Sequence, residues 1–182
     1  MNQIQAERIQ SCQLLRACPI CEGRVADLIH TQRLVPFDDS GFPGEFRVVA
    51  CDTCGMVYSD VPPAQEHYDR VYSERSKYVV PSYDPETEAR RQEQTAKTIL
   101  DYLGRKDARI LDVGCATGSL LQAFDERGCS DLTGMDPSTA CVAAASTFCW
   151  AVKGTLANHT LGAGEFDLVI LSHVLEHVAD VA

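Results

Sequence analysis

The chain has 182 residues, of which 45% are hydrophobic and 23% are charged, and its formal net charge at pH 7 is −10. This composition is typical of a folded globular protein and excludes the disordered and fibrous classes. The negative charge disfavours a nucleic acid as the main partner, because such binding relies on Lys and Arg side chains that meet phosphates. No apolar run reaches the ~18 residues that a membrane span needs, and the polar beginning, MNQIQAERIQ, lacks the features of a secretion signal. We therefore expect a cytoplasmic protein without a membrane partner.

The first part of the chain carries two Cys-x-x-Cys pairs, CPIC at 18–21 and CDTC at 51–54. The sequence has nine cysteines, and clustered cysteines in a reducing compartment more often bind a metal than form disulfides. The four thiolates of a closed, structural zinc site would come from Cys18, Cys21, Cys51 and Cys54. Strands expected at 24–29 and 45–50, on either side of a turn-rich stretch at 37–44, complete a small β-rich zinc ribbon over residues 1–60. Iron bound by the same four sulfurs, or four unrelated core thiols, are the alternatives. Cys12 is expected to stay outside the site.

Residues 61–104 are expected to form a helical connector. A short helix is expected at about 64–72, and Asp84-Pro85 predicts the start of a longer one, with Asp as N-cap and Pro in the first turn. This helix should end at Leu103, before Gly104 as its C-cap. Its apolar face would consist of Ala96, Ile99, Leu100 and Leu103. Most tyrosines of the connector are expected to pack between domains, and Tyr78 is the one that could face a substrate.

Residues 105–182 alternate apolar strands with helices, which predicts an α/β fold with a parallel sheet. Strands are expected at 109–113, 131–136 and 150–154 and from Phe166 onward. Helices are expected at 119–126 and 137–148, and the strand that starts at Phe166 should be followed by the first turn of another helix. Ligands of such sheets bind beyond the carboxyl ends of the strands, so the residues at those ends are the candidates for a binding site.

The turn after the first of these strands reads DVGCATG, from Asp112 to Gly118. It lacks the G-x-G-x-x-G pattern that cradles a pyrophosphate, because Ala116 replaces the middle glycine, and this disfavours a nicotinamide dinucleotide. A second acid, Asp136, ends the next strand, where a carboxylate can accept both hydroxyls of a ribose. Two acids around a glycine turn suit a nucleoside that carries positive charge, and S-adenosylmethionine is such a ligand.

These motifs resemble those of class I S-adenosylmethionine-dependent methyltransferases. The matching stretches are ILDVGCATG, TGMDPS and FDLVILSHVLEHV, in the family's order and spacing. The CPIC…CDTCGMVYSD segment resembles the zinc-binding segment that precedes this domain in a subgroup of bacterial methyltransferases. The resemblance implies a Rossmann-like methyltransferase sheet with S-adenosylmethionine as cofactor and a structural Zn²⁺.

The resemblance also implies roles for individual residues. Gly114 and Gly118 would let the backbone approach the cofactor, Asp112 would hold the glycine turn and the cofactor's amino group, and Asp136 would bind the ribose hydroxyls. His173 would be the candidate catalytic base near the transferred methyl. The remaining cofactor-binding candidates are Cys115 in the turn, Thr155 and Leu156 at the adenine edge, and Ser172 near the methionine end.

Several of these residues have a structural alternative. Asp136 could cap the helix that begins at Pro137. His173 and His177 are four residues apart and could bind a metal as a pair, but no third ligand is evident, so a capping or solvent-facing position is the stronger interpretation. Small apolar core or loop positions are expected for the thiols of Cys115, Cys129, Cys141 and Cys149.

The family that this chain resembles has a sheet of seven strands, and this sequence contains about four of them. We expect the chain to be a piece of a longer protein. The alternatives are that a partner or a second copy covers the open sheet edge, or that the chain is a stable half-domain without turnover.

The expected function is methyl transfer from S-adenosylmethionine to a small-molecule acceptor. Nucleotide-sugar, polysaccharide or secondary-metabolite precursors are the acceptor classes that the resemblance implies. A non-catalytic zinc-ribbon binding module is the alternative. An RNA methyltransferase is disfavoured by the net charge of −10.

Overall fold

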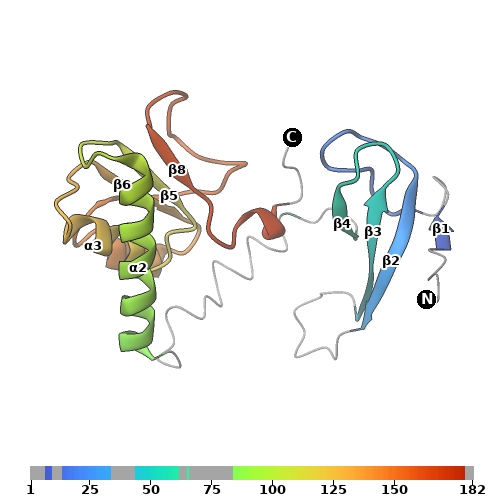
Figure 1. The fold of residues 1–182 in the computed structure, drawn as a ribbon, viewed down its shortest axis with the longest axis horizontal. Helices are drawn as coiled ribbons and strands as arrows, with labels where there is room; N and C mark the ends of the chain where they lie inside the picture. The colour runs from blue at the N-terminus through green and yellow to red at the C-terminus, as the bar shows by residue number, and fades with distance from the viewer. Residues whose placement is uncertain (1–6, 10–13, 34–43, 62–64, 66–83, 179–182) are drawn as a thin grey trace. The chain divides into compact units, whose positions relative to one another are not determined.

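A computed structural model describes residues 7–9, 14–33, 44–61, 65 and 84–178 (Figure 1). The chain divides into two compact units, one built mainly from residues 1–67 and the other from residues 68–177. The predicted segment boundaries at residues 60 and 104 stay a prediction. Cys12, Tyr78 and nearly all of the helix predicted at 64–72 lie outside the described residues. Within the described ranges, no helix is long and apolar enough to cross a membrane.

The N-terminal unit contains a four-stranded antiparallel sheet with the order β1-β2-β3-β4 (Figure 1). The strands are β1 (Glu7–Ile9), β2 (Ala26–Arg33), β3 (Glu45–Cys51) and β4 (Val57–Asp60). The prediction for β3 is confirmed to within one residue. The strand predicted at 24–29 is wrong in its limits, because β2 pairs with β3 from Ala26↔Cys51 to Arg33↔Glu45, with a bulge near Leu28. β1 and β4 were not predicted.

The core of this unit is small and is built around the cysteine pairs. Its buried members are Cys18, Ala26, Val49, Cys51 and Tyr58. Two of the five are predicted metal ligands, so a large part of this core is the wall of the sulfur cluster. A core of this size stabilises little by itself, and units of this kind usually depend on a bound metal.

Helix α2 (Pro85–Leu103), the long green helix in Figure 1, is the first element of the second unit among the described residues. The Asp84 side chain accepts the first free backbone N–H from Glu86, and Gly104 ends the helix in the left-handed conformation at φ +70°. Both caps are as predicted. Ala96 is fully buried, and the other residues of the predicted apolar face pack against the same core. The expected helix is therefore confirmed with its limits and its buried face.

A four-stranded sheet with the order β7-β6-β5-β8 forms the centre of this unit, and every pair in it is parallel. The strands are β5 (Ile110–Val113), β6 (Leu132–Asp136), β7 (Trp150–Lys153) and β8 (Leu168–Ile170). Helices α3 (Ser119–Asp125) and α4 (Thr139–Ala145) connect β5 to β6 and β6 to β7. The predicted α/β fold with a parallel, Rossmann-like sheet is confirmed.

Two helices differ from the prediction. Helix α4 is shorter than the predicted 137–148, because Ser138 caps its beginning and the Ser146 and Thr147 hydroxyls bond back to carbonyls of the last turn. After β8, the expected helix is only a single 3₁₀ turn, η2 (Leu175–His177), among the residues that the structure describes.

The two faces of this sheet are covered differently. On one face, Ile110 and Leu132 pack with the buried side chains of α2 and α3, including Ala96 and Phe124. On the other face, a second cluster around Leu111, Val113 and Met135 contacts residues of the loops and strand ends between 152 and 174. Because β5, β6 and β7 follow one another outward and β8 returns to the other side of β5, the strand order reverses at β5, where ligands of such sheets bind.

Candidate functional site

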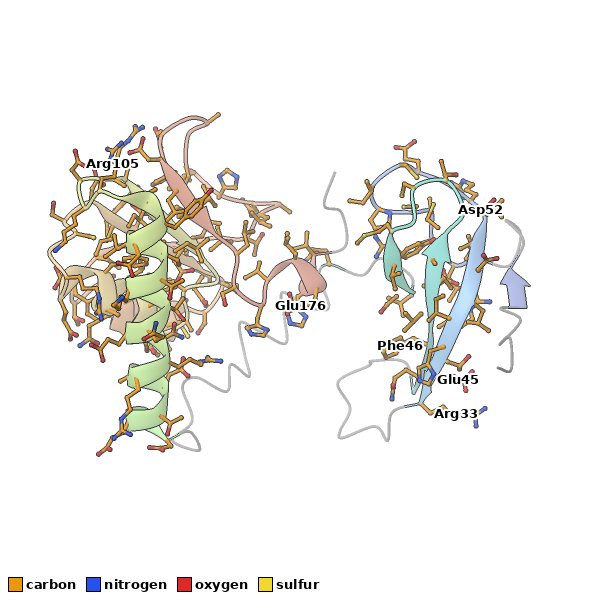
Figure 2. All side chains as sticks on the ribbon, in the orientation of Figure 1. Arg33, Glu45, Phe46, Asp52, Arg105 and Glu176 are labelled. Atoms are coloured by element: carbon orange, nitrogen blue, oxygen red, sulfur yellow. The ribbon has the colours of Figure 1, made fainter. Side chains whose placement is uncertain are left out.

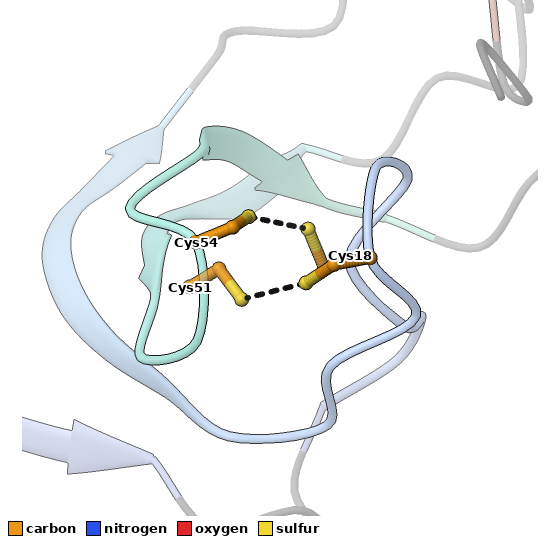
Figure 3. Close-up of side chains that lie close together, drawn as sticks. Cys18, Cys51 and Cys54 are labelled. Atoms are coloured by element: carbon orange, nitrogen blue, oxygen red, sulfur yellow. Dashed lines mark hydrogen bonds between the residues drawn. The ribbon is translucent and has the colours of Figure 1, made fainter.

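The four predicted metal ligands lie together in the N-terminal unit. Their sulfur atoms are all within 4.8 Å of one another, the only such group of three or more His, Cys, Asp or Glu residues in the described part of the chain. Two sulfur pairs, Cys18–Cys54 and Cys21–Cys51, are each 3.6 Å apart (Figure 3). Four converging thiols within this span fit one tetrahedral ion bound by sulfur. We call these four residues the knuckle cysteines.

Backbone turns hold each pair in place. The Cys18 amide donates to the Gly23 carbonyl at 2.8 Å, and the Gly55 amide donates to the Cys51 carbonyl at 2.9 Å. The backbone N–H groups of Cys54 and Thr53 point at the Cys51 sulfur and lower the pKa of this thiol to about 6. This turn therefore favours a thiolate, the form that binds a metal.

The pKa of Cys21 is raised in the same cluster. The Gly23 backbone N–H lowers it, but the neighbouring Cys54 side chain, burial and the other sulfurs outweigh this effect and raise the pKa to about 12. Without a cation, a second thiolate next to the first is unfavourable because the two negative charges repel each other. A divalent cation would remove this cost for all four sulfurs.

The glycine turn after β5 adopts a backbone that depends on its glycines. Gly114 and Gly118 have φ angles of +71° and +84°. A Cβ atom on Gly118 would lie 2.7 Å from a ring carbon of Phe148, and one on Gly114 would lie 2.7 Å from a methyl of Val174. Ala116 also has a positive φ, +51°, although it carries a Cβ. The turn is thus tightly packed and locally strained at Ala116.

Asp136 joins this turn to the start of α4. Its Oδ2 accepts the backbone N–H of Ala116 at 2.9 Å, and its Oδ1 accepts that of Ser138 at 2.8 Å. Burial raises the pKa of Asp136, and the two backbone N–H groups and the Cys141 thiol oppose this rise. The alternative that Asp136 caps this helix is wrong, because Ser138 is the N-cap of α4 and Asp136 accepts the backbone N–H of that residue. With two backbone N–H donors and the Cys141 thiol, the carboxylate of Asp136 still has acceptor capacity left for a ligand.

Asp112 is a buried acid near the carboxyl end of β5. It is 4% exposed, and no hydrogen bond joins its carboxylate to another residue that the structure describes. Burial and the nearby Asp136 charge raise its pKa to about 7. Among the described residues, no cation is a cause of the shift in the pKa of Asp112. A cationic ligand would therefore relieve the unfavourable environment of two buried carboxylates that lie close together.

The segment after β8 lies over the glycine turn. The close approach of Val174 to Gly114 brings this segment to the carboxyl end of β5. The preceding residues, Ser172 and His173, are exposed there. His173 has a left-handed backbone, φ +56°, and its Nδ1 lies 3.3 Å from Glu176 Oε1. Of the described residues around His177, none completes a candidate metal group with it.

The remaining predicted residues occupy two places. Thr155 forms an isolated bridge with Asn158, and Leu156 packs against the cluster around Met135. Cys115 is buried, and burial raises the pKa of its thiol, in keeping with the expected apolar packing. Glu176, whose Oε1 lies 3.3 Å from His173 Nδ1, was missed, although its spacing of three residues on the predicted helix was a usable signal.

Comparison with known proteins supports this description of the second unit. The profile of the methyltransferase domain family matches residues 87–182. The ubiquinone biosynthesis O-methyltransferase of Rhizobium leguminosarum is 39% identical over 80 residues, which cover 40% of this chain and 31% of that protein. The enzyme of the same name from Psychrobacter arcticus is 36% identical over 93 residues, 44% of this chain and 35% of that protein. The chain thus spans about a third of the length of these curated relatives.

Among solved structures, the magnesium protoporphyrin IX methyltransferase of Synechocystis PCC 6803 with bound S-adenosylmethionine is similar, with a TM-score of 0.48 and 20% identity. The match covers 64% of this chain and 65% of that one. The family profile covers more than half of the 182 residues. The chain therefore belongs to the methyltransferase domain family.

Proposed function

We propose that this chain is the cofactor-binding part of an S-adenosylmethionine-dependent methyltransferase. The observation that carries the proposal is the pair of desolvated carboxylates, Asp112 and Asp136, at the carboxyl ends of adjacent parallel strands. The unbonded Asp112 carboxylate fits a ligand with a positive charge, and such a ligand lowers the cost of burying both acids. A nicotinamide dinucleotide would instead place a negative pyrophosphate beside them.

The residues of the glycine turn would bind and orient this cofactor. Gly114 and Gly118 leave two positions of the turn without a side chain, so the backbone can approach the cofactor there. Asp136 would bind the ribose hydroxyls, and Asp112 would face the amino group. When bound, S-adenosylmethionine supplies a methyl group on a positively charged sulfur. The residues of the chain then act mainly by holding the reactants in line.

The knuckle cysteines would hold a structural Zn²⁺. Four sulfurs leave no coordination position open for a substrate, so we assign this ion to folding. The lowered pKa of Cys51 supports binding near neutral pH. Iron would be held by the same four sulfurs, and metal analysis of the purified protein distinguishes the two ions.

The acceptor is proposed to be a small molecule with a hydroxyl group. The relatives are named for O-methylation in ubiquinone biosynthesis, which supports an oxygen nucleophile, and nucleotide-sugar or secondary-metabolite precursors are the other candidates. The net charge of −10 favours such acceptors over RNA. His173, beside Glu176 at the ligand-binding edge, is the candidate base that would take the hydroxyl proton.

The test is a calorimetric titration of the zinc-loaded chain with S-adenosylmethionine, with NADH as the competing candidate. We expect binding of S-adenosylmethionine that Asp136→Ala abolishes and an exposed-acid control, Asp125→Asn, keeps. Binding of NADH alone, or equal affinity in wild type and Asp136→Ala, would overturn the assignment. A non-catalytic binding module would fold and load zinc but would leave the cofactor unbound.

A further inference from the structure

Asp60, at the end of β4, is a fully buried acid outside the knuckle cysteines. Its relative exposure is 0%. One oxygen, Oδ1, accepts the backbone N–H groups of Leu15 at 2.8 Å and Arg16 at 3.1 Å. The other oxygen accepts a hydrogen bond from the Arg47 guanidinium on β3. A single carboxylate therefore joins two strands to a chain segment more than forty residues away in sequence.

That segment leads directly into the first knuckle. Residues 14–17 belong to no helix or strand, and Cys18 follows them. The Arg16 guanidinium also lies 5.8 Å from the centre of the Tyr58 ring, a second contact with β4. Tyr58 in turn packs in the same small core as Cys18 and Cys51. The entry to the first knuckle is thus fixed by two neighbouring side chains of one strand.

A buried carboxylate destabilises the folded protein unless hydrogen-bond donors or a cation compensate for its charge. Asp60 has three donors, and two of them are backbone amides rather than side chains. If its role were only to pair β3 with β4, the Arg47 contact would be sufficient, since these two residues are already opposite each other in the register. The two hydrogen bonds from the backbone amides of Leu15 and Arg16 instead affect the position of the first cysteine pair relative to the second.

We propose that Asp60 is a positioning residue of the metal site, which holds the first knuckle in its metal-binding arrangement and so raises the affinity of the knuckle cysteines for Zn²⁺. This inference rests on the proposed zinc site. The chain must arrange two separate turns around one ion, and a turn that is already in place loses less conformational freedom when the ion binds. Residues that orient metal ligands through hydrogen bonds typically change metal affinity about 10- to 100-fold when they are replaced.

The test measures Zn²⁺ affinity by competition with a chromophoric chelator for wild type, Asp60→Ala, Asp60→Asn and a control. Asn keeps an oxygen that accepts the two amides, whereas Ala removes it. The control is Glu45→Ala, on β3 of the same sheet, which removes an acid from an exposed ion pair with Arg33 (Figure 2). We expect Asp60→Ala to bind about 10- to 100-fold more weakly, and Asp60→Asn and Glu45→Ala to stay within a few-fold of wild type.

Saturation with Co²⁺ provides a readout that is independent of affinity. We expect the same tetrahedral sulfur spectrum in all variants at saturation, because the ligands themselves are unchanged. Asp60→Ala with wild-type affinity, or Asp60→Asn as weak as Asp60→Ala, would overturn the role of Asp60. If Asp60→Ala gives no tetrahedral spectrum, Asp60→Ser replaces it under the same criteria. A wild-type chain that binds neither ion would instead overturn the zinc site itself.

Discussion

Replacement of Asp112 by Asn should stabilise the second unit at neutral and basic pH. The carboxylate is buried, lies near a second acid and has no hydrogen bond to a described residue, and its pKa is raised to about 7. Asn has nearly the same shape and carries no charge. The variant therefore removes an unfavourable charge without opening a cavity.

The magnitude follows from the two pKa values of this carboxyl group. An unfolded Asp titrates near pH 3.9, so the folded protein binds the proton more tightly between about pH 4 and pH 7. The stability of the wild type is highest while the proton is bound, and it falls as the pH rises through this window. Proton linkage with these two pKa values predicts that the free energy of unfolding of the wild type falls by about 2.5 kcal/mol between pH 5 and pH 8. Asp112→Asn should not show this decrease.

Urea unfolding at pH 5, 6, 7 and 8 measures this difference directly. The single tryptophan, Trp150, lies in β7, so its fluorescence reports on the second unit. The stability gain of Asp112→Asn should grow with pH, whereas Asp125→Asn, at an exposed acid on α3, should show no such growth. The measured quantity is the free energy of unfolding of Asp112→Asn minus that of the wild type. If this difference stays constant with pH, or decreases from pH 5 to pH 8, the argument from burial is refuted. The same variant should lose S-adenosylmethionine binding, a conflict between stability and function that is common at binding sites.

Three further outcomes are expected. Gly118→Ala should destabilise the second unit by about 3 kcal/mol or more in urea unfolding. The reason is that φ of Gly118 is +84° and the new methyl group would clash with Phe148 and Ala145. A variant with near wild-type stability would contradict this packing. Ala116→Gly should stabilise the same unit by about 1 kcal/mol, since it relieves a left-handed alanine at φ +51°, and a loss of stability in the same assay would show that this backbone is unstrained. Removal of the proposed Zn²⁺ by a strong chelator should abolish the amide dispersion of the N-terminal unit in NMR spectra and leave the fluorescence transition of Trp150 unchanged. An N-terminal unit that stays folded would show that its core is stable without a metal.

Local signals in the sequence were sufficient for the elements that they specify. Helix α2 has an Asp-Pro start and a glycine end, and these fix its limits without information from the rest of the fold. The strands β5 and β6 are buried along their whole length, as expected of central parallel strands, and each was predicted to within one residue. The Cys-x-x-Cys spacing likewise predicted the two tight turns that present the four sulfurs.

Other features depend on partners that are distant in sequence. β4 has only four residues and was not predicted, because its pairing with β3 leaves no local pattern. The burial of Asp60 follows from donors at residues 15, 16 and 47, and no spacing rule connects these positions. In the same way, Asp136 was expected to bind a ribose, but its bond to the Ala116 amide shows a second task, which is to hold the glycine turn.

The most direct test of the central claim is the number of protons released when S-adenosylmethionine binds. A cationic ligand beside Asp112 should lower the raised pKa of this carboxyl, so binding at pH 7 should release up to about half a proton. Calorimetric titrations in two buffers with different ionisation enthalpies measure this number. The account predicts proton release in wild type and in Asp125→Asn, and no binding in Asp112→Asn. Binding without proton release, or unchanged affinity in Asp112→Asn, would contradict it.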